Sequence, residues 1–164
     1  GEFVRNPKED LVKVAVVERH QGTGNVACGF LKGYGIKEGA VALSVAHDSH
    51  NIIVVGVNDE EMEFAVNSLI AQEGGIVLVK EGKVIEQMPM PIAGLMSDQS
   101  GEWVDEKLTS IHEKAYTELG ICGDVEPVMT LCFMSLAVIP EIKLTDMGLF
   151  DVTTFSFIPV EISR

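Results

Sequence analysis

Residues 40–56, AVALSVAHDSHNIIVVG, decide the fold of this chain. Two apolar runs, 40–43 and 52–55, flank a polar centre, and short continuous runs of this kind are typical of buried strands. The connection is too short for a parallel crossover, so we predict an antiparallel pair. Residues 44–51 hold two imidazoles, a carboxylate, two hydroxyls and an amide. Because rigid strands often position functional loops, this connection is the first candidate site.

The segment before this pair predicts one further strand. Residues 11–17 alternate loosely and are rich in valine, which favours a strand. A glycine-rich segment, 22–39, follows, and each interior glycine costs a helix about 1 kcal/mol relative to alanine. We therefore predict a loop there with at most a short helix. Residues 22–27, GTGNVA, match the dinucleotide fingerprint, but that fingerprint needs a following helix. A loop that allows close backbone approach is the favoured interpretation.

Two helices and a hairpin are expected after the central pair. Asn58 is a predicted N-cap with Glu61 at the capping-box position, and the apolar stripe that follows ends at Gly74-Gly75. Residues 76–79 and 83–87 flank Glu81-Gly82, which favours a hairpin. A second amphipathic helix is predicted over about 101–119, and His112, on the flank of its stripe, is expected to face solvent.

The last third of the chain is apolar and harder to divide. Residues 129–139 predict a buried strand or a core-crossing segment, residues 140–148 a loop, and residues 155–162 a last strand. Strands that outnumber two clear helices favour an α+β domain with a mixed sheet, two-layered or sandwich-like.

Composition limits the partners and the compartment. The chain has 164 residues, 46% of them hydrophobic, and carries a net charge of −13, which disfavours nucleic acid and anionic membranes as partners. No apolar run is long enough to span a membrane. Three cysteines without a CxxC pair favour a reducing, cytoplasmic compartment. Gly1-Glu2-Phe3 is typical of an expression scar, so we expect a scar and flexible lead-in over 1–8 and one domain over 9–162.

Several chemistries fit the polar loop. A metal site would use His47, Asp48 and His50, although a catalytic zinc usually takes three ligands that do not all crowd one short loop. A Ser-His-Asp triad normally joins distant segments. The loop side chains could also serve only to satisfy their own backbone. We favour a loop that contacts substrate, with seven candidate residues if the first strand reaches the same rim: His47, Asp48, Ser49, His50, Asn51, Arg19 and His20.

Several separated motifs along the chain carry a family resemblance. These motifs are VAVVERH at 14–20, TGN at 23–25, GFLKGYG at 29–35, SVAHDSHNIIVVG at 44–56, ND at 58–59, PIAGLMS at 91–97 and VIPEIKLTD at 138–146. In this order they resemble the carboxy-terminal domain of bacterial adenine deaminases, members of the amidohydrolase superfamily. The resemblance covers about residues 9–160, and Met147 stands where many members have a basic residue.

The resemblance implies that this chain is an accessory domain of a larger enzyme. Adenine deaminases convert adenine and water to hypoxanthine and ammonia with a divalent metal, Mn or Fe, held in an amino-terminal (β/α)8 barrel. The HxH motif of that barrel does not occur in this sequence, so the resemblance implies no barrel, no catalytic residue and no bound metal here, and no activity of this chain alone. The implied partners are the barrel, adenine and a second copy in a homo-oligomer. The alternatives are a purely structural or oligomerisation domain, or a stand-alone small-molecule-binding domain that uses the same loop.

Overall fold

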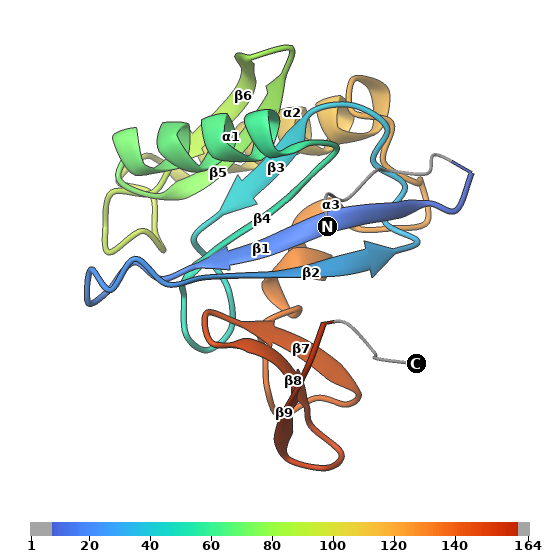
Figure 1. Ribbon diagram of the computed structural model, residues 1–164. Helices are drawn as coiled ribbons and strands as arrows, with labels where there is room; N and C mark the ends of the chain where they lie inside the picture. The colour runs from blue at the N-terminus through green and yellow to red at the C-terminus, as the bar shows by residue number, and fades with distance from the viewer. Residues whose placement is uncertain (1–7, 161–164) are drawn as a thin grey trace.

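The computed structural model describes residues 8–160 as two β-sheets and three helices (Figure 1). The larger sheet has the order β2-β1-β4-β3-β5-β6, and the smaller one has the order β7-β8-β9. The strands of the larger sheet are β1 (Leu11–Val17), β2 (Val26–Lys32), β3 (Ala40–Leu43), β4 (Ile52–Gly56), β5 (Gly75–Lys80) and β6 (Lys83–Pro89). The smaller sheet contains β7 (Ile142–Thr145), β8 (Gly148–Asp151) and β9 (Ser156–Ile158), and the helices are α1 (Asp59–Ala71), α2 (Gly101–Thr117) and α3 (Pro127–Cys132).

The α+β class without a barrel is confirmed. Within that class every strand pairing in both sheets is antiparallel rather than mixed. The predicted central pair is β3 and β4, with Leu43 opposite Ile53, and the predicted first strand, β1, lies on the other side of β4. The hairpin of β5 and β6 is also confirmed.

Strand alternation gives the larger sheet two different faces. On one face large side chains such as Leu43, Ile53 and Leu78 pack against α2, α3 and the smaller sheet. On the other face α1 lies over Ala40, Ala42 and their neighbours. Small residues let this helix approach closely: a Cβ built on Gly56 would lie 2.5 Å from Met62 Cγ.

The N-cap of α1 confirms half of the predicted capping box. Asn58 Oδ1 accepts a hydrogen bond from the Glu61 N–H at 2.8 Å, which satisfies one of the free donors at the helix start. The Glu61 side chain does not return to Asn58. Its carboxylate accepts from the Gly82 N–H at 3.1 Å and so ties α1 to the β5–β6 turn.

The glycine-rich segment corrects the sequence prediction in two ways. Residues 26–32 form β2, an edge strand, because the cost of glycine in a helix does not apply to a strand that pairs with β1 along its length. Gly22 and Gly24 have φ angles of +64° and +74°, and a Cβ on either would meet nothing within 4 Å. They provide left-handed backbone rather than close approach, and the strand that follows removes the helix that a dinucleotide site requires.

The carboxy-terminal third also differs from the prediction. Residues 127–132 form α3 rather than a strand, because Glu126 accepts from the Met129 N–H as N-cap and Pro127 suits the first helical position. Residues 142–151, expected mainly as a loop, form the β7–β8 hairpin with Asp146 and Met147 in its turn. The last strand covers only residues 156–158 of the predicted 155–162.

His112 does not simply face solvent. Its ring is half-buried, with Nδ1 2.6 Å from the Leu108 carbonyl and Nε2 against the Glu126 carboxylate, so it joins α2 to the cap of α3. The expected scar and lead-in fall mostly on residues 1–7, outside the described part of the chain. None of the described helices is long and apolar enough to cross a membrane.

Candidate functional site

Three connecting segments meet at one end of the larger sheet. The antiparallel order places the end of β1 beside the start of β4, and the end of β3 beside the start of β5. The loops 18–25 and 44–51 therefore leave the sheet on the same side, together with the segment 90–97 that follows β6 (Figure 1). The sheet thus brings together polar residues that are far apart in the sequence.

The 44–51 loop is fixed mainly through its backbone. At its base the buried Ser44 Oγ accepts from the Gly75 N–H at 2.8 Å and donates to the Gly94 carbonyl at 2.5 Å. Further along, the His47 N–H donates to the Cys132 carbonyl at 2.9 Å, so α3 holds the other side of the loop. These contacts leave the side chains of residues 47–49 outside the anchoring network.

Arg19 joins the loop to the segment after β6. Its Nε donates to the His50 carbonyl at 2.5 Å, and a terminal guanidinium nitrogen donates to the Ala93 carbonyl at 2.8 Å. Both carbonyls belong to non-glycine residues with positive φ, +50° for His50 and +60° for Ala93. Such conformations persist where the surroundings hold them, and one cation holds both here. Arg19 therefore lies at the same end of the sheet as the 44–51 loop.

His20 and Asn51 also take part in this loop junction. His20 Nε2 donates to the Ser49 carbonyl at 2.7 Å, and the buried Asn51 accepts from the Arg19 N–H through Oδ1 at 3.3 Å. The two side chains therefore serve to hold backbone. Arg19, His20 and Asn51 lie in the predicted cluster, and their observed contacts connect its loops.

Glu18 belongs to the same loop junction, although it was not among the predicted site residues. Its carboxylate accepts from the N–H groups of His20, Gln21 and Thr23 and from the Thr23 hydroxyl. Hydrogen bonds from Thr23 first, and then from Gln21 and His20, outweigh desolvation and lower the pKa of Glu18 to about 2. An acidic residue directly before a polar turn is the only sequence signal for such a carboxylate.

The two imidazoles of the loop lie close together. The ring centroids of His47 and His50 are 5.9 Å apart, and His47 lies 4.9 Å from the ring of Phe133 in the turn after α3. Burial, followed by the neighbouring His47 and Arg19, lowers the pKa of His50. His50 Nδ1 is buried and has no hydrogen-bond partner among residues 8–160. The loop therefore holds two neighbouring half-buried imidazoles, and burial lowers the pKa of one of them, His50.

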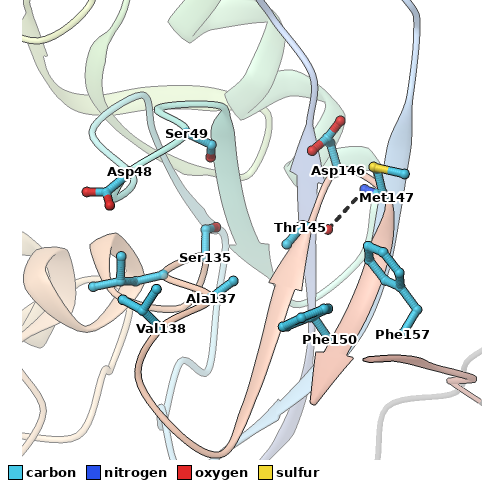
Figure 2. Close-up of a pocket in the computed structure, with 11 residues that line it drawn as sticks. Asp48, Ser49, Ser135, Ala137, Val138, Thr145, Asp146, Met147, Phe150 and Phe157 are labelled. Carbon is cyan, nitrogen blue, oxygen red and sulfur yellow. Dashed lines mark hydrogen bonds between the residues drawn. The ribbon is translucent and has the colours of Figure 1, made fainter. Parts of the chain in front are cut away.

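Asp48 and Ser49 form the exposed tip of the loop and border a cleft of about 370 Å³ (Figure 2). The opposite wall comes from the smaller sheet, where Phe150 and Phe157 lie below the turn that carries Asp146. Sequence reasoning found the two loop residues of this cleft and missed its other lining residues, because the hairpin of β7 and β8 was expected to be a loop. The missed residues are Ser135, Leu136, Ala137, Val138, Thr145, Asp146, Met147, Phe150 and Phe157.

The side chains of the loop bear on two chemistries, a metal site and a catalytic triad, each of which requires its own arrangement. Among residues 8–160, no group of three or more His, Cys, Asp and Glu side chains is placed to hold a metal ion, so His47, Asp48 and His50 do not fit the alternative metal site. Ser49 Oγ accepts from the Asn51 N–H at 3.5 Å, and no Ser-His-Asp hydrogen-bonded chain occurs in the described part. What remains is a set of hydrogen-bonding groups on a firmly held loop.

The fold and this loop define a small α+β domain that presents polar groups at one sheet end. The sequence profile of the adenine deaminase C-terminal domain matches residues 1–156, so the chain belongs to that family. It is 74% identical over 161 residues to "Adenine deaminase 2" of Desulfotalea psychrophila, covering 98% of this chain and 28% of that protein.

More distant relatives show the same partial coverage. The chain is 52% identical to "Adenine deaminase" of Ligilactobacillus salivarius and 48% identical to "Adenine deaminase" of Bacillus velezensis, over 99% and 97% of its own length. It spans 28% and 27% of those two proteins. The chain therefore corresponds to little more than a quarter of the length of the curated relatives that it matches.

Proposed function

We propose that this chain is the carboxy-terminal accessory domain of an adenine deaminase, and that its 44–51 loop contacts the substrate at an active site in the amino-terminal barrel. The parent enzyme would hydrolyse adenine to hypoxanthine and ammonia. A divalent ion in the barrel, Mn or Fe, would supply a water-derived nucleophile at neutral pH. The present chain would contribute binding groups and exclusion of water rather than the reacting atoms.

The single observation that carries this proposal is the way the loop is held. Its backbone is fixed by Arg19, Ser44 and the Cys132 carbonyl, while Asp48 is exposed at its tip and the half-buried His47 ring packs against Phe133. A purine edge offers ring-nitrogen acceptors and an amino donor. The carboxylate of Asp48 accepts hydrogen bonds, and an imidazole donates or accepts them. A preorganised loop of this kind loses little entropy when a ligand binds.

The test is steady-state kinetics of adenine deamination by the full-length enzyme. The triple variant His47→Ala, Asp48→Ala, His50→Ala is expected to lower kcat/KM at least about tenfold, equivalent to about 1.4 kcal/mol of transition-state binding. The matched control replaces Lys83 and Glu106, two exposed residues away from the loop, with alanine. If the triple variant stays within about twofold of the unchanged enzyme, the loop does not contribute to the transition state.

The alternatives have different signatures. A purely structural or oligomerisation domain predicts normal kinetics for the loop variant, with loss of assembly when the whole domain is deleted. A stand-alone binding domain predicts that this chain binds adenine without the barrel. Equilibrium dialysis of the chain against adenine distinguishes the latter from the accessory role.

A further inference from the structure

The two faces of the smaller sheet are buried to different extents. Leu144 and Leu149 are paired across β7 and β8, and both pack toward β2, where a Cβ on Gly29 would lie 3.3 Å from Leu149. Alternation sends Phe150 to the opposite face, directly across from Phe157 on β9. These two rings meet edge to face, with their centroids 5.3 Å apart. The outer face therefore carries two aromatic rings, of which Phe157 is exposed and Phe150 is half-buried. Lys143 lies on the same face, opposite Phe150, and is buried.

Exposed apolar side chains are most frequent in the last third of the described chain. Sixteen large apolar side chains are exposed among residues 8–160, and nine of them lie between Met129 and Val160. The most exposed are Phe155 at 78%, Met147 at 71% and Val138 at 70%. Clustered apolar exposure on this scale marks an interaction surface more often than a free one.

The chemistry of the adjoining cleft describes what would fill it. The floor is aromatic and aliphatic, while Asp48 and Asp146 stand at the rim (Figure 2). Ser135 is 95% buried at the edge of the cleft, and its hydroxyl has no hydrogen-bond partner among the described residues. A complementary surface has an apolar side chain at its centre and basic side chains or N–H donors around it.

We propose that this outer face is the surface that contacts the amino-terminal part of the same polypeptide. The face is formed by Val138, Met147, Phe150, Phe155 and Phe157. The proposal rests on the function proposed above and specifies which side of the domain faces the barrel. Two observations select this occupant. The relatives extend well beyond the matched region, which is 28% of their length in the first case, and the matched family is by its description a C-terminal domain. The cleft is also continuous with Asp48 and Ser49 of the candidate loop.

A second apolar groove, between α1 and the β1–β2 pair, fits this occupant less well. It has about the same volume, 380 Å³, and is lined by Ala15, Val17 and Val26. The Lys13–Asp59 ion pair, at 2.7 Å, borders it, and it lies on the α1 face, away from the 44–51 loop side chains that border the cleft. Seating the barrel in this groove would leave the candidate loop without a route to substrate.

Site-specific photo-crosslinking in the full-length polypeptide tests the proposal. Met147 is replaced by p-benzoylphenylalanine in one variant and Phe155 in a second, so that failure of either to fold does not end the test. The matched control carries the same probe at Val26, which is 56% exposed beside the second groove. Mixed light and heavy isotope-labelled chains separate crosslinks within a polypeptide from crosslinks between copies.

The expected result is a crosslink from position 147 or 155 to a peptide amino-terminal to this domain in the same chain, and its loss when the probe is moved to position 26. Crosslinks between light and heavy chains would assign the face to a second copy and overturn the proposal. Crosslinks from position 26 alone, or none from either test position, would also overturn it. Because the readout is a mass and not a rate, it is independent of the loop kinetics that test the proposed function.

Discussion

The two sheets of this domain differ in what they bury. The six-stranded sheet has α1 on one face and α2, α3 and the smaller sheet on the other, so its central strands are inaccessible to solvent on both sides. The three-stranded sheet buries Leu144 and Leu149 on one face and exposes aromatic rings on the other. The larger sheet is buried on both faces, whereas the smaller sheet keeps exposed aromatic side chains of the kind that protein interfaces contain.

Substitution of one apolar residue in each sheet is expected to give the largest contrast. Leu78→Ala in β5 should lower the free energy of unfolding by about 3 kcal/mol, because Leu78 is fully buried and the cavity left behind cannot collapse. Phe157→Ala in β9, about half-exposed, should cost less than about 1 kcal/mol in this chain. Urea denaturation measures both, and equal losses would remove the distinction between the sheets.

Glu86 tests how α2 is fastened to the larger sheet. Burial raises its pKa, but hydrogen bonds from Lys107, Ser110 and Lys114 outweigh that effect and lower the pKa to about 2. A lowered folded-state pKa stabilises the protein above the unfolded value near 4.5, and this contribution is lost as pH falls toward 2.

Glu86→Gln should therefore cost about 2 kcal/mol at pH 7. The difference from the unchanged protein should shrink below pH 4.5, the ordinary pKa of the carboxyl. Urea denaturation at a series of pH values checks this, with the exposed Glu106→Gln as control. If the difference in unfolding free energy between the two proteins does not change with pH, side-chain packing rather than the charge of Glu86 stabilises this contact.

A smaller effect is expected at the base of the candidate loop. Ser44→Ala leaves the Gly75 N–H and the Gly94 carbonyl without their shared partner, which should cost about 1.5 kcal/mol. Ser49→Ala at the exposed tip should change stability by less than about 0.5 kcal/mol. Thermal unfolding of the two variants compares the anchored and the presented ends of one loop, and similar losses would mean that the tip is also anchored.

Much of the larger sheet could be predicted because its signals are local. Continuous apolar runs identify β3 and β4, the cap at Asn58 identifies the start of α1, and Glu81-Gly82 identifies the β5–β6 turn. β2 was missed because its exposed positions alternate with positions that only the smaller sheet buries. Its partner surface comes from residues more than a hundred positions later, which no local pattern reveals.

The residues of the candidate site could be predicted where they have a local sequence signal, as for the larger sheet. Residues 47–51 stand out by density of polar groups, and Arg19 and His20 follow once β1 is placed beside β4. The contribution of Ala93 is a bare carbonyl, which has no side-chain signature. The positions of the cleft residues on β8 and β9 follow from how the smaller sheet packs on the larger one. Leu144 and Leu149 make that packing contact, which is a tertiary interaction that local sequence does not reveal.

The guanidinium of Arg19 has a consequence for how this domain fluctuates. Two loops that are remote in sequence, around His50 and around Ala93, are both held by hydrogen bonds from this one cation. Opening either connection releases part of what holds the other, so the two form a single cooperative unit of local unfolding rather than independent flexible segments. In native-state hydrogen exchange the amides of both segments should respond to rising denaturant with a common slope, as one sub-global opening.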